Sequence, residues 1–425
     1  MHADASPPLD GPIAAPGPAS DRLDLPRLPV LGWSTFSGPS HSTLPCILDR
    51  DDVLFTSSGR AAIALALRAL RIGHGDRVLV PTYHCPTMVA PIVAVGAEPV
   101  FFPIDATGAP ATAALDDRQM QGVRAMIAAH YFGLPQPMAA IRSFCDDHGI
   151  ALIEDCAHAL FGVSDGRPVG RWGDYAIASL TKFLPVVDGG CLVPSRGIED
   201  MPRLGRQTFA SEVKSFANAL ELGVMHGRVA GLNTLLGGVF TAVSRLRGRR
   251  HGPERSESDA APTDVAGKWL ADFAAGSRIG HAASPWTRWI AHHAHRERIV
   301  AARRRNYALL ARLVAAVPGV RALRPILPEH AAPYVFPLWV DRPETVYQEV
   351  RRAGVPVFRW DELWPSSQAP AGEVGLEWAT HVFQIGCHQD LRPEDVAAEV
   401  EALSRIFEKD APGRQVHLAP AAQVA

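Results

Sequence analysis

A lysine and an aspartate each stand near the end of an apolar stretch that could form a buried strand. Lys182 follows the run from Tyr175 to Ser179, and Asp155 follows the run that begins at Ala151. A lysine at the end of a buried strand can lose hydration, which lowers the pKa of its amine and lets it form a carbon–nitrogen double bond. A carboxylate there can pair with a protonated ring nitrogen. We therefore expect amine–carbonyl chemistry, with a solvated loop lysine and an N-cap aspartate as the plainer alternatives.

A turn that could bind an anion is the third candidate. Ser58, Gly59 and Arg60 stand where a glycine-containing turn passes into a helix rich in alanine and leucine. The exposed amides and the dipole at a helix start favour an anion, so a phosphate would fit there. A capping turn without a ligand has the same composition.

The elements that must position these residues alternate between strand and helix. This alternation predicts an α/β fold with a largely parallel sheet and helices on both faces, in which ligands sit at the carboxyl ends of the strands. Asp155 and Lys182 would lie there. Strands are expected at 77–81, 99–104, 123–129, 151–154, 175–179 and 191–193, and helices at 60–70, 87–95 and 138–148.

The second half of the chain predicts a smaller α+β domain. A mainly helical stretch at 200–245 precedes a polar segment at 245–264 that we expect to be a mobile loop. A long helix over 285–317, a strand at 334–340 and helices at 344–353 and 393–407 should follow. The predicted division is a disordered tail at 1–30, a large domain at 45–285, a small domain at 286–410 and a tail at 411–425.

The composition argues against several other classes of protein. The 425 residues carry a net charge of −2, which gives no electrostatic case for nucleic acid or an anionic membrane. No apolar run is long enough to span a membrane, the start lacks a signal-peptide pattern, and the six cysteines are scattered without metal spacing. A cytoplasmic location is therefore expected. His292 and His295 have a possible metal spacing on the long helix, but a solvated helix face is favoured.

The order of the motifs resembles that of the DegT/DnrJ/EryC1/StrS aminotransferase family, whose members use pyridoxal 5'-phosphate (PLP) and mainly aminate nucleotide-linked keto-sugars. The motifs are SSGRAAIALAL, VLVPTYHCPTMVAPIVAVGAEPVFFPID, AHYFG, LIEDCAHALFG, VGRWGDYAIASLTKF and DGGCLV. A weaker likeness continues through residues 303–307 and 384–391. The resemblance implies an aspartate-aminotransferase-like fold (PLP fold type I).

The resemblance also implies roles for single residues. Lys182 looks like the lysine that forms a Schiff base with PLP, and Asp155 like the partner of the pyridine nitrogen. His158 stands where many members have a glutamine that contacts the phenolic oxygen of PLP. His130 belongs to a family motif to which the sequence alone gives no role.

The phosphate and the ring of PLP have implied contacts as well. Residues 58–60 and Ser179 occupy phosphate-binding positions in the resemblance. The residue that stacks on the ring should be near Tyr83 or His84, because Cys85 falls where the family usually has an aromatic side chain. Of these two, we expect His84 to contact the cofactor.

The resemblance implies an aminotransferase that moves an amino group from an amino acid, expected to be glutamate, to a keto acceptor. The acceptor is expected to be a nucleotide-linked keto-sugar or a related biosynthetic intermediate. A homodimer is also implied. Two alternatives remain: a PLP-dependent sugar dehydratase of the same family, and a non-catalytic PLP-fold regulatory or binding protein. Lys182 argues against the dehydratase, because known dehydratases carry histidine there. Arg359 and Trp360 are candidates for acceptor contact, with a surface role as the plainer alternative.

Overall fold

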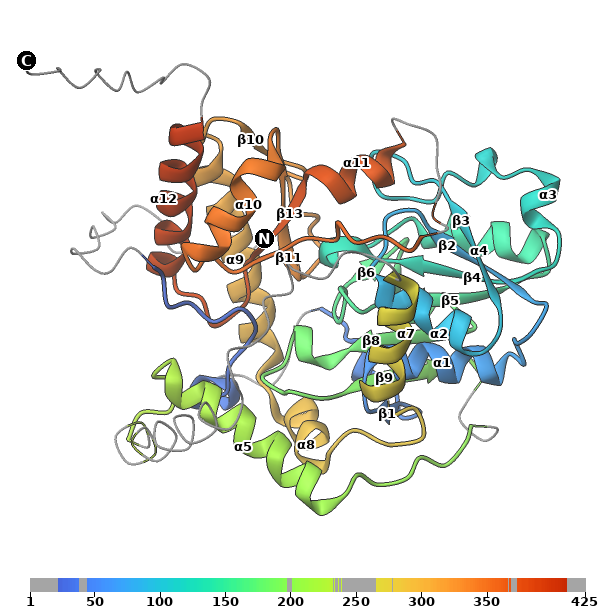
Figure 1. Ribbon diagram of the computed structural model, residues 1–425. Coiled ribbons are helices and arrows are strands. Elements are labelled where there is room, and N and C mark those ends of the chain that lie inside the picture. Colours follow the sequence, from blue (N-terminus) through green and yellow to red (C-terminus); the bar gives the residue numbers. More distant parts are fainter. Residues whose placement is uncertain are drawn as a thin grey trace, which may run out of the picture.

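A seven-stranded sheet forms the centre of the larger half of the molecule in the computed structural model (Figure 1). The structure describes residues 22–37, 44–196, 201–231, 233, 236, 238, 265–276, 278–365, 367 and 373–410. The strand order is β1-β9-β8-β5-β4-β2-β3, parallel from β8 to β3, with β9 antiparallel to both β8 and β1. The strands are β1 (Leu54–Thr56), β2 (Arg77–Pro81), β3 (Glu98–Phe102), β4 (Val123–Ala129), β5 (Ala151–Asp155), β8 (Tyr175–Ser179) and β9 (Gly190–Pro194).

Both faces of this sheet are buried, because successive side chains of each strand point to opposite sides. Val78 and Ile153 pack in one apolar cluster with residues of α1, α2 and α7, whereas Leu79 and Leu152 pack in another with residues of α4. The predicted α/β architecture is therefore confirmed. The helices are α1 (Gly59–Ala69), α2 (Pro86–Ala94), α4 (Met138–Asp147) and α7 (Val265–Gly276).

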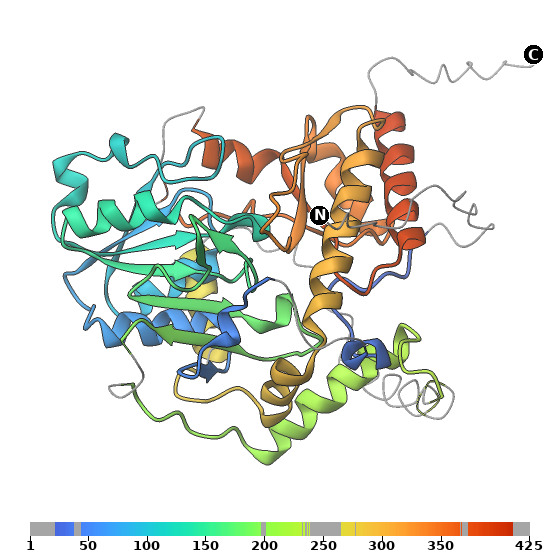
Figure 2. The ribbon, with the colours of Figure 1, turned by 180° about the vertical axis from the view of Figure 1, so that it is seen from behind.

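A smaller antiparallel sheet of four strands, in the order β10-β11-β13-β12, forms the second half. Its apolar core includes Leu310, Val350 and Leu403 from the three helices that pack against it. Figure 2 shows α9 as the long helix that runs from this half towards α8. The elements are α9 (Arg296–Val314), β10 (Val320–Ala322), β11 (Val335–Val340), α10 (Pro343–Arg352), β12 (Val357–Phe358), α11 (Val374–His381), β13 (Val382–Gly386) and α12 (Pro393–Asp410).

The N-terminal segment lies along the smaller sheet, where part of a disordered tail was expected. The amide of Leu23 donates to the carbonyl of Ala353 at 2.8 Å, and a ring nitrogen of His388 is 2.9 Å from the carbonyl of Pro26. Leu23 and Leu25 pack against the core of this half. The prediction of a tail is therefore wrong for residues 22–30, and residues 1–21 lie outside the described part of the chain.

The long helix predicted over 285–317 is two helices, α8 (Pro285–His293) and α9. Ala294 between them is extended, with a ψ of 139°. Nδ1 of His295 accepts the amide of Arg298 at 2.8 Å and thereby caps α9. His292 and His295 consequently do not share a helix face, which removes the basis for a metal site there.

The remaining elements are short or belong to the edge of the larger half. The polar segment at 245–264 lies outside the described residues. Within the described residues no helix is long and apolar enough to cross a membrane. The elements are α3 (Asp117–Met120), β6 (Val163–Ser164), β7 (Arg167–Pro168), α5 (Phe209–Met225) and 3₁₀ turns η1 (Trp33–Phe36), η2 (Ile47–Asp49), η3 (Thr112–Ala114), η4 (Tyr131–Gly133) and η5 (Leu180–Lys182).

A buried acid on α12 leads to a prediction about stability. Glu399 is fully buried, and neither carboxylate oxygen has a hydrogen-bond partner among the described residues. Burial, and after it the charge of Asp395, holds the pKa of Glu399 well above its ordinary value. Stability should therefore fall as the pH rises past the ordinary pKa of glutamate, because the unfolded chain then releases a proton that the folded chain keeps.

We expect Glu399→Gln to melt at least about 2 °C above the wild type at pH 8, and this gain to disappear near pH 4. Thermal unfolding followed by circular dichroism across this pH range measures the difference. Glu401→Gln, at an exposed position on the same helix, is the matched control. Parallel stability curves for wild type and Glu399→Gln would contradict the prediction.

Candidate active site

A cavity of ≈ 530 Å³ lies at the carboxyl ends of β4, β5 and β8, next to the start of α1. This is the edge of a parallel sheet at which ligands are expected. Side chains of both halves of the molecule and of α5 line it. The lining residues include Ser58, Gly59, Arg60, Cys85, His130, Asp155, His158, Ser179, Lys182, Asp188, Lys214, Asn218, Arg278 and Trp360.

Lys182 and Asp155 share this cavity. Lys182 ends the 3₁₀ turn η5, directly after β8, and Asp155 is the last residue of β5. Burial lowers the pKa of the Lys182 amine, an effect that Asp155 and Cys85 oppose. Burial raises the pKa of Asp155, although the Ala157 amide, 2.8 Å from Oδ1, and the charge of Lys182 work against this rise. The arrangement provides an amine poised to lose its proton and a buried carboxylate that a nearby cation would stabilise.

The start of α1 packs tightly against the end of β8. Ser58 caps the helix, since its Oγ accepts the Ala61 amide at 3.2 Å. A side chain at Gly59 would place its Cβ 3.3 Å from Cβ of Ser179, so glycine permits the close approach. Ser179 Oγ lies 3.3 Å from the hydroxyl of Thr181. The amides at the helix start and the Ser179 hydroxyl thus face one region of the cavity, where an anion would fit.

His158 is held in one tautomer. Its Nδ1 accepts the amide of Phe132 at 3.3 Å, which leaves the proton on Nε2. Burial, with a further contribution from Lys182, keeps the pKa of His158 well below its ordinary value. Its ring packs against those of Tyr334 and Trp360, with centroids 4.4 and 4.9 Å away. His158 is therefore neutral at pH 7 and lines the cavity as a potential hydrogen-bond donor.

His84 lies elsewhere, and this is a correction to the predicted site. Its Nδ1 donates to the carbonyls of Pro81 and Thr82 at 3.0 Å, and its Nε2 accepts the amide of Trp364 at 3.0 Å. Burial lowers its pKa to about 4. Both ring nitrogens are therefore engaged in hydrogen bonds that join the end of β2 to the segment around Trp364, and the ring does not line the cavity. Cys85 lines it instead.

The position of Cys85 leads to a prediction about thiol reactivity. All six cysteines are free, and Cys85 alone among them is not buried. We expect iodoacetamide to alkylate Cys85 at least roughly tenfold faster than any other cysteine, because only this thiol is accessible. Mass spectrometry of the labelled peptides measures the rates. Cys85→Ser should abolish the fast label, and fast labelling of any other cysteine in the native protein would contradict the prediction.

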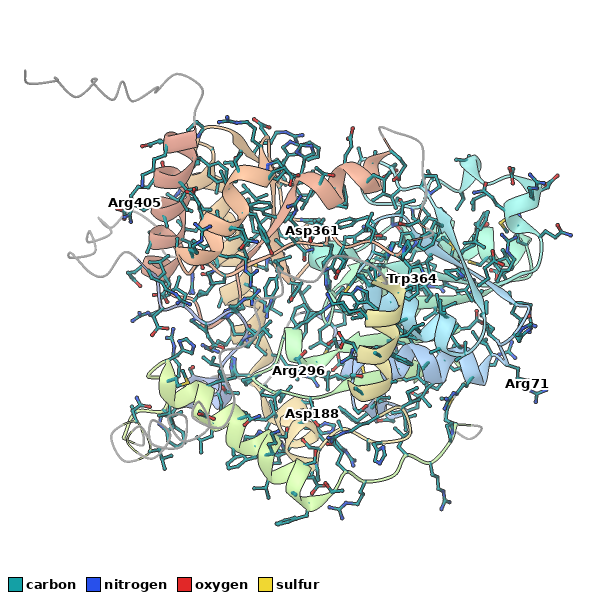
Figure 3. All side chains as sticks on the ribbon, viewed as in Figure 1. Arg71, Asp188, Arg296, Asp361, Trp364 and Arg405 are labelled. Carbon is teal, nitrogen blue, oxygen red and sulfur yellow. The ribbon has the colours of Figure 1, made fainter. Side chains whose placement is uncertain are left out.

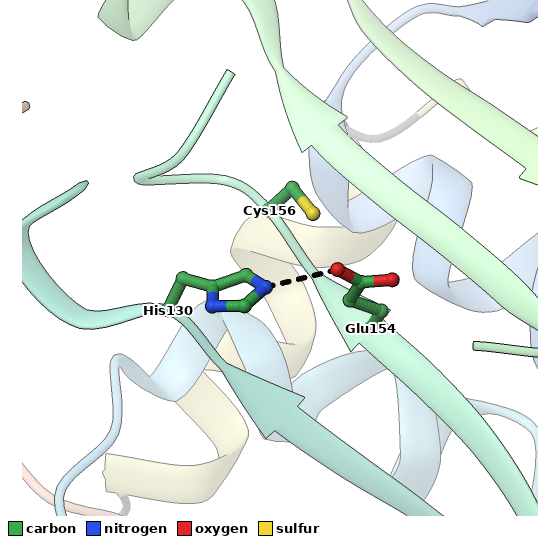
Figure 4. A group of neighbouring side chains, drawn as sticks. All are labelled: His130, Glu154 and Cys156. Carbon is green, nitrogen blue, oxygen red and sulfur yellow. Dashed lines mark hydrogen bonds and ion pairs between the residues drawn. The ribbon is translucent and has the colours of Figure 1, made fainter. Parts of the chain in front are cut away.

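His130 has a structural role behind Asp155. The carboxylate of Glu154 accepts hydrogen bonds from three backbone amides of residues 170–173 at 2.7 to 3.2 Å. It also accepts one from Nε2 of His130 at 3.0 Å (Figure 4). Nδ1 of His130 in turn accepts the amide of Gln136 at 2.9 Å. Cys156 completes a buried trio with the geometry of a metal site. Because the carboxylate already has four donors, the trio is better explained as the anchor of the chain on either side of Asp155.

Asp188, labelled in Figure 3, lines the cavity and joins three segments of the chain. Its carboxylate accepts hydrogen bonds from the side chains of Gln207 at 2.8 Å and Ser215 at 3.1 Å. It also accepts hydrogen bonds from the amide and hydroxyl of Ser284 and from the hydroxyl of Thr287. These contacts fix the loop between β8 and β9 against α5 and α8. The sequence alone does not indicate these contacts, because the partners are distant along the chain.

The smaller half supplies an aromatic wall, of which the sequence indicated Trp360 but not Tyr334. Trp360 lines the cavity, and the ring of Tyr334 lies 5.3 Å from Nζ of Lys182. Arg359, the other candidate for acceptor contact, donates a hydrogen bond to the carbonyl of Thr380 at 2.7 Å and forms ion pairs with Glu344 and Asp361. It therefore does not line the cavity.

Three further cations line the cavity. Arg60, Lys214 and Arg278 form no ion pair with a carboxylate in the described part of the chain. Arg278 instead donates to the side-chain oxygen of Gln207 at 3.0 Å, and Arg60 approaches the carbonyl of Asp272 at 3.5 Å. Together with Lys182 these cations outnumber the two lining carboxylates, Asp155 and Asp188, so the cavity has an excess of positive charge that favours an anionic ligand.

Comparisons with known proteins agree with these features. Residues 46–204 match the model of the DegT/DnrJ/EryC1/StrS aminotransferase family. A UDP-N-acetyl-3-dehydro-alpha-D-glucosamine 3-aminotransferase of Acidithiobacillus ferrooxidans is 39% identical over 32% of this chain and 38% of its own. A GDP-perosamine synthase of Vibrio cholerae is 35% identical over 33% of this chain and 40% of its own. The matches thus span about two fifths of the length of these relatives.

The fold has relatives among solved structures over most of its length. DesV of S. venezuelae, solved in complex with a ketimine intermediate, has a TM-score of 0.54 and 20% sequence identity, with 85% of this chain and 86% of that chain covered. At this identity the likeness concerns the fold, and it confirms the expected fold class.

Proposed function

We propose, on the premise that residues 46–204 belong to the DegT/DnrJ/EryC1/StrS aminotransferase family, that the protein is a PLP-dependent aminotransferase. The observation that carries the proposal is the pairing of Lys182 and Asp155 in one cavity, with the pKa of the amine lowered and that of the acid raised by burial. The amino donor is proposed to be glutamate. The acceptor is proposed to be a nucleotide-linked keto-sugar.

The residues of the cavity fit PLP. The start of α1 and Ser179 would hold its phosphate, since exposed amides and a hydroxyl are suited to an anion. Asp155 would face its ring nitrogen, and the neutral His158 would donate a hydrogen bond from Nε2. When bound, PLP supplies a protonated ring that delocalises negative charge from a neighbouring carbon.

Side chains of the protein itself would provide the covalent attachment and the proton transfer. With its uncharged amine, Lys182 would hold the cofactor covalently at its aldehyde carbon, with release of water, and would carry a proton to and from the donor carbon. Its lowered pKa increases the fraction of uncharged amine near pH 7. Beside a cationic ring nitrogen, Asp155 would keep its negative charge and so hold the proton on that nitrogen. On the side of the cavity that faces the smaller half, Trp360 and Tyr334 would limit the access of water to the Lys182 amine.

The proposed acceptor class is supported by the unpaired cations. Diphosphate groups are anionic, and Arg60, Lys214 and Arg278 offer positive charge in the same cavity. We expect Lys214→Ala and Arg278→Ala each to raise the KM for a nucleotide-linked keto-sugar about tenfold with little change in kcat. The KM for an uncharged cyclitol ketone is the internal control. Equal effects on both acceptors would point to a structural role for these cations.

A homodimer is also proposed. Residues on α5 expose apolar side chains, with Phe209 80% and Met225 65% accessible, and α5 also lines the cavity through Lys214 and Asn218. A second copy would cover this apolar face and close the cavity at the same time. A monomer mass by light scattering at micromolar concentration would contradict the proposal. The free thiols are in keeping with a cytoplasmic location, which is proposed on that basis.

Reductive trapping tests the central proposal. Borohydride added to the protein with PLP should fix the cofactor covalently on the peptide that contains Lys182. The chain has only four lysines, so mass spectrometry can assign the label without ambiguity. No label, or a label on Lys214, Lys268 or Lys409, would refute the proposed function.

A further inference from the structure

Arg303 on α9 is completely buried and joins three separate segments. Its Nε donates to the side-chain oxygen of Gln389 at 2.8 Å, and Nη1 donates to the carbonyls of Pro333 and Tyr334, each at 3.0 Å. Nη2 donates to the carbonyl of Lys182 at 2.8 Å. One guanidinium thus connects the main chain of Lys182 with the start of β11.

All of these acceptors are neutral. Arg303 forms no ion pair with a carboxylate within the described residues, and its guanidinium lies 4.3 Å from the centre of the Phe183 ring. Burial lowers its pKa to about 10. A buried charge without a counter-ion costs several kcal/mol, so Arg303 is a poor choice for stability alone. Its rigid planar set of donors is suited instead to fixing several carbonyls in one geometry.

The carbonyl of Lys182 has no backbone donor among the described residues. The turn η5 ends at Lys182, and no backbone amide of the described residues donates to the carbonyls of Lys182 or Phe183. Arg303 bonds the first of these carbonyls, and Nε2 of Gln389 donates to the second at 2.8 Å. The chain that carries Lys182 therefore depends on these two side chains for its position.

The same guanidinium also fixes the aromatic wall. Arg303 bonds the carbonyl of Tyr334, whose amide donates to the carbonyl of Phe132 at 2.7 Å. The Tyr334 ring lies 5.3 Å from Nζ of Lys182 and packs against His158. Arg303 is therefore bonded to the main chain of both Lys182 and Tyr334, the two residues whose side chains make this contact.

We infer that Arg303 is a positioning residue that directs the amine of Lys182 into the cavity by holding the main chain of Lys182 and of Tyr334 at a fixed separation. Arg303 does not line the cavity and so acts through Lys182. The inference rests on the proposed function only in taking Nζ of Lys182 as the reactive atom.

Two variants of neighbouring arginines provide a matched test. Arg303→Met removes the contacts to Lys182 and Tyr334, whereas Arg304→Met removes contacts only to the carbonyls of Pro328 and Ala331. The first measurement is the rate and pH midpoint of acetylation of Lys182 by acetic anhydride in the cofactor-free protein, relative to Lys268. The second is the rate of borohydride trapping of PLP on Lys182.

We expect Arg303→Met to shift the pH midpoint of Lys182 acetylation and to slow trapping by about 10²-fold, because a displacement near 1 Å can have that effect. Arg304→Met should match the wild type in both. Arg303→Lys keeps a charge but cannot bond four carbonyl and amide oxygens in a plane, so it should resemble Arg303→Met. Wild-type behaviour of Arg303→Met in both measurements would overturn the inference.

The outcomes separate this inference from the proposed function. If the wild type is not trapped by borohydride, the proposed function fails, while acetylation of Lys182 still decides the role of Arg303. If circular dichroism shows that Arg303→Met is unfolded, Gln389→Leu replaces it, since this change removes one bond to Arg303 and the bond to the Phe183 carbonyl. An unshifted midpoint in folded Gln389→Leu would then overturn the inference.

Discussion

Lys182→Ala is expected to lower the rate of amino transfer by about 10⁴-fold or more, because it removes both the covalent attachment and the group that carries the proton. The loss should appear in each half of the reaction when followed by absorbance in a single turnover. Small primary amines such as ethylamine should restore part of the proton-transfer rate, since the alanine leaves space for them in the cavity.

The chain offers a clear control for this experiment. Lys268 is partly exposed, pairs with Glu362 at 3.2 Å and does not line the cavity, so Lys268→Ala should keep the wild-type rate. Wild-type turnover by Lys182→Ala would end the assignment. Loss of turnover in both variants would instead indicate general damage to the fold.

The second large effect is expected at Asp155. Asp155→Asn keeps the size of the side chain but removes the negative charge that would hold a proton on the ring nitrogen, so turnover should fall roughly 10³-fold. Covalent trapping on Lys182 should persist, because Asp155 is not needed for the attachment itself. The distinguishing measurement is thus the ratio of turnover to trapping.

Asp155→Glu provides the conservative comparison. It keeps the charge but moves the carboxylate away from the Ala157 amide that now lies 2.8 Å from it, and we expect partial activity. An Asp155→Asn enzyme with wild-type turnover would show that another group protonates the ring. If Asp155→Asn lost trapping and turnover to the same extent, the result would show that Asp155 is needed for the folding of the cavity.

The sequence predicted the strands of the larger sheet well. The strands at 77–81, 123–129 and 175–179 have the predicted bounds, because parallel strands buried on both faces are continuous apolar runs with sharp ends. The break between α8 and α9 was missed, since neither proline nor glycine marks it. It is created by His295, whose side chain caps the second helix.

The candidate site could be predicted where its residues are contiguous. Lys182, Asp155 and the turn before α1 each follow a strand, and the parallel sheet brings such strand ends together. Arg303 and Tyr334 could not be assigned in this way, because they reach the site through the packing of α9 and β11 against segments more than a hundred residues away. Local pattern carries no information about such contacts, and the misplacement of His84 has the same origin.

The attachment of residues 22–30 to the smaller sheet affects how the protein can be shortened. A fragment cut at residue 46, where the family match starts, would lack Leu23 and Leu25 and would uncover the apolar surface on which they pack. It would also leave the backbone of Ala353 and the ring of His388 without their present partners. Affinity tags are therefore best joined, and truncations best made, ahead of residue 22 and not where the family match starts.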